Sequence, residues 1–355
     1  MRLHQPWYGV KLFCLLIPVL LFTLSCKRKA AKEEASVTPA EAGKYPPKSL
    51  KKVTVYPYWV TNCQYAGYYV GREKGIYRKY GIDLNILEFK PFVTTNEIIA
   101  QKQTDFAILW LVNAIQLRNS GIPIVNIAQF STRSSLMLIA KKSSGITKIE
   151  DLNGKRAGIW DGYDLQPQTL FSRYHLNTEI VHIGSTNNLF LQGGVDVTNA
   201  NWFDEYHAIL NSGYDSSELV RFFFSDYGLN FLEDGIYCLQ DKLKEDPEIC
   251  VAFVKATIES WIYALNHRKE SVEIILKYQR QQNMPANRSH QTWMIERYRD
   301  LYLPEGAKTM NIMLKEKDYL SNAEVLLQNK LIVSITPYKE FFKPYYSLNH
   351  SSSEK

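Results

Sequence analysis

From residue 53 onward, short β-rich segments alternate with helical segments, and this alternation constrains the fold more than any other feature. Such alternation is typical of α/β proteins with a mainly parallel sheet. The expected strands lie at 53–56, 82–89, 105–110, 124–130, 136–140, 154–160 (a basic turn leading into a strand), 179–183, 195–198, 219–225 and 235–239. The expected helices lie at 63–74, 94–102, 111–119, 149–152, 168–175 and 204–211, with one more after Ser185.

The alternation runs through two successive sets of strands and helices, which predicts two lobes. The tract 247–278 then changes character, with apolar residues at helical spacing that indicate packing. We expect the chain to cross into the second lobe near Lys141 and to return near Gly235, so that two crossing segments form a hinge. Lobe I then comprises 51–140 and 235–345, and lobe II comprises 141–234. A ligand would lie in the cleft between the lobes.

The N-terminal 25 residues are typical of an export signal rather than of a folded domain. Arg2 and Lys11 provide a positive start, and the apolar run 12–24, about 13 residues, is shorter than a membrane-spanning helix. Ser25-Cys26 then ends the run as a bacterial lipoprotein signal does, although Thr23 stands where leucine is usual. We therefore expect Cys26 to carry lipid.

Residues 26–50 are rich in charge, alanine and proline, which predicts a flexible tether between the lipid and the lobes. The expected location is the cell envelope, on the periplasmic or outer-surface side of a membrane.

The formal net charge of +6 lies mostly outside the expected lobes. The signal and the tether carry most of the excess of Lys and Arg over acidic residues, which leaves the lobes close to neutral. A nucleic-acid partner would require a clustered basic face. This charge distribution therefore disfavours nucleic acid as a partner.

Few motifs for catalysis or metal binding occur in the sequence. Beyond Cys14 and Cys26, the cysteines are Cys63, Cys238 and Cys250, with no C-x-x-C pair and no His/Cys cluster at zinc spacing, so no metal site is expected. The signatures of nucleotide-binding enzymes, serine hydrolases and zinc proteases are also missing from the sequence. We expect a protein that is not an enzyme and needs no cofactor.

Tryptophans follow several expected strands. Trp59, Trp110, Trp160 and Trp202 each stand where a strand runs into a loop, and the carboxyl ends of strands in open α/β sheets face the ligand crevice. An indole there can stack on a planar ring. The alternative is that these rings complete the edges of the core.

Acidic pairs occur near the same strand ends. One interpretation of Asp204-Glu205 is that the acidic pair interacts favourably with the dipole at a helix start. The other is that Glu205 accepts hydrogen bonds from an exocyclic amine. Glu233-Asp234 precedes the expected return crossing and serves either the hinge or the ligand. The polar segment 131–135 either ties the hinge or meets an anionic group.

Several segments together resemble the family of thiamine-precursor-binding proteins of ABC importers and thiamine pyrimidine synthases, related to the SsuA-like binding proteins. They are 64–70 (QYAGYYV), 73–77 (EKGIY), 80–84 (YGIDL), 151–160 (DLNGKRAGIW), 201–206 (NWFDEY) and 227–237 (YGLNFLEDGIY). The resemblance implies a type II periplasmic-binding-protein fold, with two lobes around a cleft. It also implies recognition of an aminopyrimidine in that cleft.

The expected ligand-binding residues combine this resemblance with the strand-end positions. They are Trp59, Asn62, Gln64, Tyr65, Trp110, Trp160, Asp161, Gly162, Trp202, Asp204, Glu205, Tyr206, Glu233 and Asp234. The synthase branch consumes pyridoxal phosphate and its own histidine and carries a cysteine-rich motif. Here Tyr65 replaces that histidine, the segment 197–201 has no cysteine, and Asp204 replaces the usual asparagine.

The leading hypothesis is therefore a solute-binding lipoprotein that passes a thiamine pyrimidine precursor, or a similar aminopyrimidine, to an ABC importer permease. A binding protein for a sulfonate- or nitrate-like anion is the second hypothesis, and a strongly cationic cleft would favour it. The synthase-like enzyme is the third, and it lacks the cysteine motif.

Overall fold

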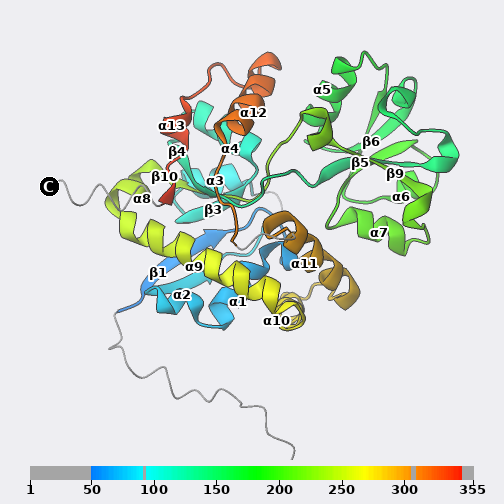
Figure 1. Ribbon diagram of the computed structural model, residues 1–355. Coiled ribbons are helices and arrows are strands. Elements are labelled where there is room, and N and C mark those ends of the chain that lie inside the picture. The colour runs from blue at the N-terminus through cyan, green and yellow to red at the C-terminus, as the bar shows by residue number, and fades with distance from the viewer. Residues whose placement is uncertain (1–48, 91–92, 305–308, 346–355) are drawn as a thin grey trace, which may run out of the picture. The chain divides into compact units, whose positions relative to one another are not determined.

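Two five-stranded sheets organise the chain, as the alternation predicts (Figure 1). The computed structural model describes residues 49–90, 93–304 and 309–345, so the expected signal, Cys26 and nearly all of the tether lie outside the described residues. The first sheet has the order β2-β1-β3-β10-β4, and the second has the order β7-β6-β8-β5-β9. The strands are β1 (Lys51–Tyr56), β2 (Ile82–Ile86), β3 (Phe106–Leu109), β4 (Ile124–Gln129), β5 (Leu136–Lys141), β6 (Arg156–Trp160), β7 (Glu179–Ile183), β8 (Val197–Asn201), β9 (Leu219–Phe223) and β10 (Gly235–Leu239).

Each sheet contains one antiparallel strand, and that strand is the one the chain forms immediately after it changes sheet. In the first sheet β1 pairs in parallel with β2 and β3, whereas β10 pairs antiparallel with β3 and β4. In the second sheet β6 pairs in parallel with β7 and β8, whereas β5 pairs antiparallel with β8 and β9. The carboxyl ends of the parallel strands of both sheets therefore remain available to form a ligand crevice.

The expected outgoing crossing near Lys141 is wrong. β5 is hydrogen-bonded to β8 and β9, so it belongs to the second sheet and the chain changes sheet within 130–135. The segment 136–140 therefore belongs to lobe II and not to lobe I. A buried apolar strand has the same residue pattern in either sheet, so the sequence does not show which strands it pairs with. The return crossing, over 229–234, lies where it was expected.

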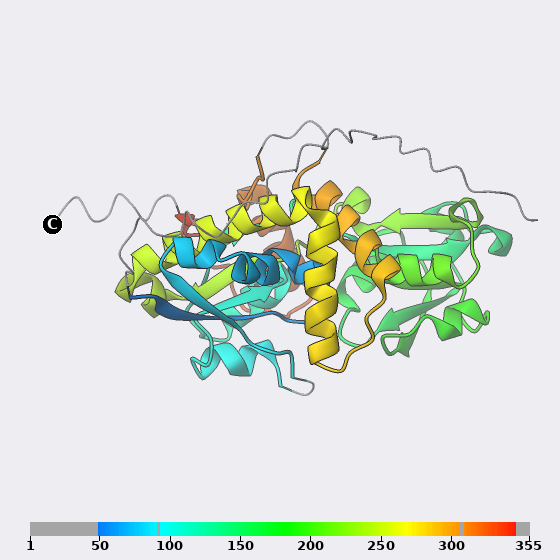
Figure 2. The same cartoon turned by 90° about the horizontal axis from the view of Figure 1, so that it is seen from below.

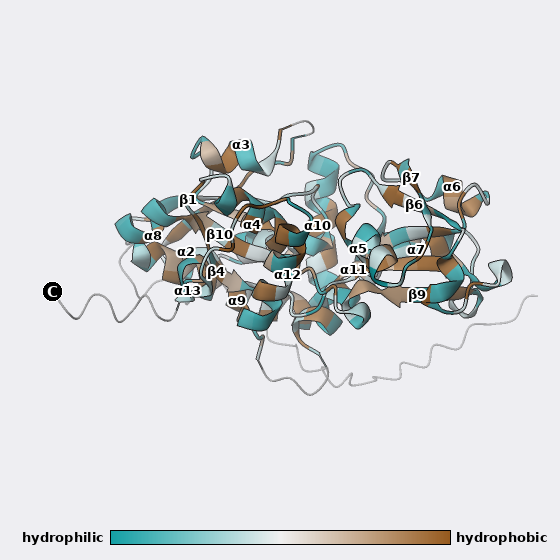
Figure 3. Cartoon of the chain, turned by 90° about the horizontal axis from the view of Figure 1, so that it is seen from above, coloured by the Kyte–Doolittle hydropathy of each residue, from teal (hydrophilic) through white to brown (hydrophobic). Residues whose placement is uncertain are grey.

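Helices cover the sheets and extend the first lobe at its C-terminal side (Figures 1 and 2). They are α1 (Ala66–Glu73), α2 (Ile76–Lys79), α3 (Thr95–Ala100), α4 (Leu111–Asn119), α5 (Leu165–Arg173), α6 (Asn188–Leu191), α7 (Glu205–Asn211), α8 (Gln240–Glu245), α9 (Pro247–Asn266), α10 (Arg268–Gln281), α11 (Arg288–Tyr302), α12 (Glu316–Gln328) and α13 (Tyr338–Phe341). Most carry both hydrophobic and hydrophilic residues, so each presents one face to a core (Figure 3).

The core of the first lobe is built largely from aromatic side chains. The Phe106 ring of β3 stacks on Phe253 of α9 with centroids 4.0 Å apart, and Trp261 of the same helix stacks on Tyr298 of α11 at 5.6 Å. Trp261 is buried. The apolar stripe expected within 247–278 is therefore a packing face, as predicted.

The two crossing segments are tied to each other by the buried side chain of Glu233. Its Oε1 accepts hydrogen bonds from the Ser134 hydroxyl (2.9 Å) and from the Ser135 backbone N–H (2.9 Å). Its backbone carbonyl accepts from the Gln129 amide (2.6 Å), and the Ser134 N–H donates to the side chain of Asn230 (2.8 Å). Of the two roles considered for 131–135 and for Glu233, these contacts match the tying of the hinge.

The close approach of α1 to α9 requires a glycine at position 67. A Cβ atom added there would lie 2.5 Å from the Trp261 ring, which is held in place by its own stacking. We expect Gly67→Ala to lower the free energy of unfolding by about 1–2 kcal/mol, because overpacking outweighs the better helix propensity of alanine. Urea denaturation measures this. Gly184→Ala is the control, since no atom lies within 4 Å of its added Cβ and it should change stability little; equal stability of Gly67→Ala and wild type would contradict the packing argument.

Candidate functional site

A cavity of about 300 Å³ lies where strand ends of the two lobes face each other. Its lining residues follow β1 and β3 in lobe I, and β6, β7 and β8 in lobe II. They are Tyr58, Trp59, Gln64, Trp110, Trp160, Asp161, Tyr163, Ile183, Gly184, Ser185, Asn201, Phe203, Asp204 and Glu205. The cavity is thus at the carboxyl ends of parallel strands, as the sheet topology predicts.

Aromatic rings form much of the cavity wall and cross from one lobe to the other. Tyr163 meets Trp160 of its own lobe and Trp110 of lobe I edge to face, with centroids 5.5 Å apart in both pairs. The buried indole N–H groups of Trp110 and Trp160 have no hydrogen-bond partner among the described residues, which is unusual for buried donors. The lobes therefore touch through rings that also line the cavity.

Trp59 is the most exposed of these rings. It follows β1, lies against Phe89 with centroids 5.2 Å apart, and keeps 40% of its surface accessible. A large apolar ring at the rim of a cavity provides a flat surface on which a planar ligand can stack.

Glu205 supplies a carboxyl group from lobe II at the start of α7. Its Oε2 accepts a hydrogen bond from the Asn201 N–H at 2.9 Å. Burial, and then the neighbouring charge of Asp204, raise the pKa of Glu205 to about 8. Burial thus disfavours the ionised form of Glu205, and a ligand that donates a hydrogen bond or carries positive charge would favour that form.

Asp204 connects the cavity to a contact between the lobes. Its carboxylate pairs with Nε2 of His290 on α11 at 2.9 Å. Nδ1 of His290 lies 2.9 Å from Nδ1 of His207 on α7, and the His207 ring stacks on Trp293 with centroids 4.9 Å apart. Burial and the nearby His290 lower the pKa of His207. At this distance one of the two facing nitrogens donates its hydrogen and the other accepts it.

Asp234 lies beneath the cavity rather than in its wall. The Tyr302 hydroxyl donates to its Oδ2 at 2.9 Å, and the Tyr298 hydroxyl at 3.2 Å. Its Oδ1 accepts from Gln64 at 3.2 Å and from Tyr58 at 3.3 Å. Burial raises the pKa of Asp234. Asp234 therefore orients two residues of the wall without lining the cavity.

Half of the predicted ligand-binding residues meet at this cavity: Trp59, Gln64, Trp110, Trp160, Asp161, Asp204 and Glu205. The other seven do not line this cavity. Asn62 caps the short helix before α1, and Tyr65 and Tyr206 are core residues. Glu233 and Asp234 are buried in the network described above, and Gly162 lines a second cavity.

Trp202 faces away from the cavity, although its neighbours Asn201 and Phe203 line it. It stands beneath the Arg297 guanidinium, 5.1 Å from the ring centroid. Side chains alternate between the two faces at a strand end, so adjacent residues point to opposite sides. Sequence reasoning also missed Tyr163 and His290; Tyr163 lies three residues after Trp160, but His290 has no local signal.

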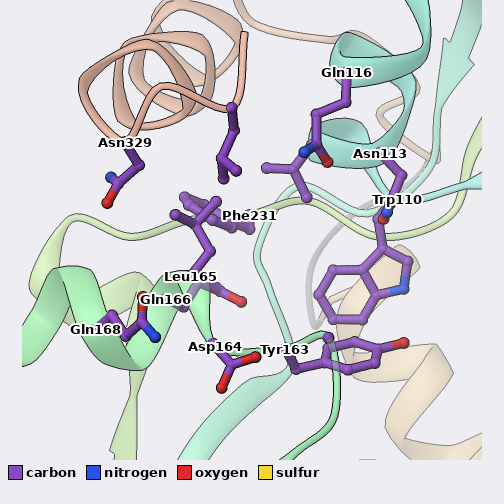
Figure 4. A pocket seen from close by; sticks show the side chains of 13 residues that line it. Trp110, Asn113, Gln116, Tyr163, Asp164, Leu165, Gln166, Gln168, Phe231 and Asn329 are labelled. Atoms are coloured by element: carbon purple, nitrogen blue, oxygen red, sulfur yellow. The ribbon is translucent and has the colours of Figure 1, made fainter.

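A second cavity of about 420 Å³ lies on the other side of Trp110 and Tyr163, between α4 and the start of α5 (Figure 4). It shares these two rings with the first cavity, and side-chain amides provide much of its remaining wall. Neither cavity wall contains lysine, arginine, histidine or cysteine. Among the described residues, no group of three His, Cys, Asp or Glu side chains could hold a metal ion.

A family model described as "NMT1/THI5 like" matches residues 62–271. The chain belongs to the NMT1/THI5-like family. The match includes both crossings, all of lobe II and most residues of the first cavity.

The relatives of this chain include proteins named as binding proteins and proteins named as synthases. The formylaminopyrimidine-binding protein of Halalkalibacterium halodurans is 21% identical over 76% of this chain and 79% of its own length. The 4-amino-5-hydroxymethyl-2-methylpyrimidine phosphate synthase of Legionella pneumophila is 32% identical, but over only 31% of this chain and 35% of its own length. The chain is thus similar both to a protein named as a binding protein and to one named as a synthase.

The solved structure of the periplasmic aliphatic sulphonate binding protein SsuA from Escherichia coli superimposes with a TM-score of 0.64 at 13% identity, over 84% of this chain and 93% of that protein. This NMT1/THI5-like chain therefore has the two-lobe fold of SsuA-type periplasmic binding proteins. No helix among the described residues combines the length and the apolar character needed to cross a membrane.

The raised pKa values of Glu205 and Glu233, each about 8, predict how stability depends on pH. An unfolded Glu ionises near pH 4.3, so between that value and about 8 the folded state holds protons that the unfolded state has lost. The free energy of unfolding should therefore fall as pH rises from 6.5 to 8.5. Glu205→Gln and Glu233→Gln should each flatten part of this slope in urea titrations at fixed pH. A slope that is unchanged in both variants would contradict burial of the two acids.

Proposed function

We propose that this protein captures a small planar ligand bearing an amine, such as a thiamine pyrimidine precursor, and delivers it to an ABC importer. The observation that carries the proposal is that Trp59 of lobe I and Glu205 of lobe II line one cavity. A ligand that stacks on Trp59 and donates to Glu205 bridges the lobes and favours their closed arrangement.

The size and the chemistry of the cavity support this ligand class. A volume of about 300 Å³ is at the small end of ligand pockets and suits a single substituted ring. Because Tyr163 contacts Trp110 and Trp160 edge to face, these contacts leave ring faces on which a planar ligand can stack. Glu205 and Asp204 provide acceptors for an exocyclic amine or a protonated ring nitrogen.

The charge around the cavity weighs against an anionic solute. No lysine or arginine lines either cavity, while Asp161, Asp204 and Glu205 line the first. A sulfonate or nitrate in the first cavity would meet acidic side chains and no lysine or arginine of the lining, which is costly in a partly buried site. Neither of these two cavities is the strongly cationic cleft that the second hypothesis needs.

The same lining weighs against the synthase reaction. The first cavity contains no lysine, histidine or cysteine, so it offers neither an imine-forming amine nor a soft metal ligand. Tyr65, where the synthases have histidine, is a core residue, and 197–201 forms β8 without cysteine. These residues support the proposal that the protein binds its ligand without transforming it.

Calorimetry with 4-amino-5-hydroxymethyl-2-methylpyrimidine and its N-formyl amine analogue tests the proposal. Wild type should bind with a stoichiometry of one, and proton release should be detectable near pH 7, because the ligand favours ionised Glu205. Glu205→Gln should lose about 1.5–3 kcal/mol of binding free energy and the proton release. Trp59→Ala should lose a similar amount, and Trp59→Phe less.

Glu218→Gln is the matched control, since this exposed acid lies outside the cavity and should leave binding unchanged. The outcome that would overturn the proposal is the absence of binding by any aminopyrimidine together with clear binding of an aliphatic sulfonate or nitrate.

We also propose that Cys26 is acylated and holds the protein at the cell envelope, where it would meet its importer. The proposal rests on the apolar run that ends at Ser25-Cys26 and on the polar segment 27–50 that follows. Several acyl chains on one cysteine would give stable membrane attachment, whereas a single chain binds only marginally.

Expression of the full chain in a bacterial host tests the anchor. Wild type should partition into the detergent phase and show lipid mass on an N-terminal Cys26, whereas Cys26→Ser should remain in the aqueous phase without added mass. Cys14→Ser is the control and should behave as wild type. A wild-type product that is unmodified and begins before Cys26 would contradict the proposal.

A further inference from the structure

We propose that the amide-lined second cavity binds a neutral, hydroxyl-bearing arm of the same ligand whose ring occupies the first cavity. This inference deepens the proposed function and rests on it. It assigns the ligand to a class: a planar amine-bearing ring joined to a polyhydroxylated chain or sugar that carries no phosphate.

The two cavities are adjacent compartments of one cleft. Trp110 and Tyr163 line both and touch edge to face, so a ligand that fills both cavities would have to lie over this ring pair. Both compartments also draw residues from the two lobes. In the second, α4 and the segment after α12 belong to lobe I, and 162–168 belongs to lobe II. A ligand that fills both would add contacts across the cleft.

The polar wall of the second cavity consists mainly of side-chain amides. Asn113 and Gln116 lie three residues apart on one face of α4, and Gln168 lies on α5 on the other side of the cavity (Figure 4). Asn113 and Gln168 are exposed and Gln116 is half-buried, so all three amides are accessible to a molecule that enters the cavity. Each offers two donors and an acceptor, which matches hydroxyl groups that both donate and accept.

The remaining lining fits a carbon chain that bears such hydroxyls. Phe231, Leu165 and Leu331 are apolar lining residues. The rings of Trp110 and Tyr163 form one side of the cavity (Figure 4). Flat aromatic surfaces combined with planar polar side chains suit the C–H faces and the hydroxyl edges of a polyol. The volume of about 420 Å³ is larger than that of the ring compartment.

A phosphate arm does not fit this compartment. No lysine, arginine or histidine is among its lining residues, and Asp164 stands at the start of α5. Phosphate sites normally supply cations or a helix start free of acidic groups. The carboxylate of Asp164 can instead accept from a hydroxyl, so the compartment discriminates between an arm and its phosphate ester.

Three probes on one ring test the inference by calorimetry with the full chain. They are 4-amino-2-methylpyrimidine, the same ring with a pentitol arm at carbon 5, and the phosphate ester of that armed ring. For wild type we expect the arm to tighten binding at least tenfold, about 1.4 kcal/mol, and the phosphate to remove that gain. The double variant Gln116→Leu/Gln168→Leu should bind the bare ring within twofold of wild type and should lose the gain from the arm.

Gln328→Leu is the matched control, because this exposed amide lies next to Asn329 but does not line the cavity, and it should keep the full gain. Thermal unfolding midpoints of the variants confirm that they are folded. If wild type binds the bare ring but the arm adds nothing, or if the double variant keeps the gain, the arm compartment is overturned and the proposed function stands. If neither the bare nor the armed ring binds, the proposed function fails and this inference fails with it.

Discussion

The carboxyl group of Glu233 is buried at the point where the chain returns from the second sheet to the first, and the rest of the structure depends on how it is bonded. Serine donors from the outgoing crossing, at positions 134 and 135, satisfy its Oε1. A buried carboxyl without such partners would be strongly destabilising. The two crossings are therefore held side by side, and this places the strand ends of one sheet opposite those of the other.

The cavity chemistry follows from that placement. Tyr163 contacts Trp110 and Trp160 edge to face, and these contacts cross the cleft. The ion pair between Asp204 and His290 links the start of α7 to α11. Asp204 has two roles, because it holds His290 and also helps to raise the pKa of its neighbour Glu205. The contact between the lobes and the ionisation of the acid in the ligand site thus share one residue, so a change in either is expected to affect the other.

The errors in the sequence predictions have identifiable causes. The strand 136–140 was predicted correctly as a strand but assigned to the wrong lobe, since pairing partners carry no local signature. Trp202 stands at a strand end as expected, yet alternation turns its ring away while Asn201 and Phe203 face the cavity. Tyr65 and Tyr206 belong to segments that resemble the family, but such a resemblance does not distinguish wall residues from core residues.

The sequence by itself determined the α/β class, the ten strands that the described residues form, the two-lobe organisation and seven of the residues that line the cavity. These follow from periodicity and from the position of a residue relative to its own strand, which are local properties. Only the tertiary structure decided the outgoing crossing, the joining of Asp204 to His290, and the amide compartment beyond Trp110. Each of these brings together residues far apart in the chain, and their proximity is set by strand pairing and helix packing, which no local pattern encodes.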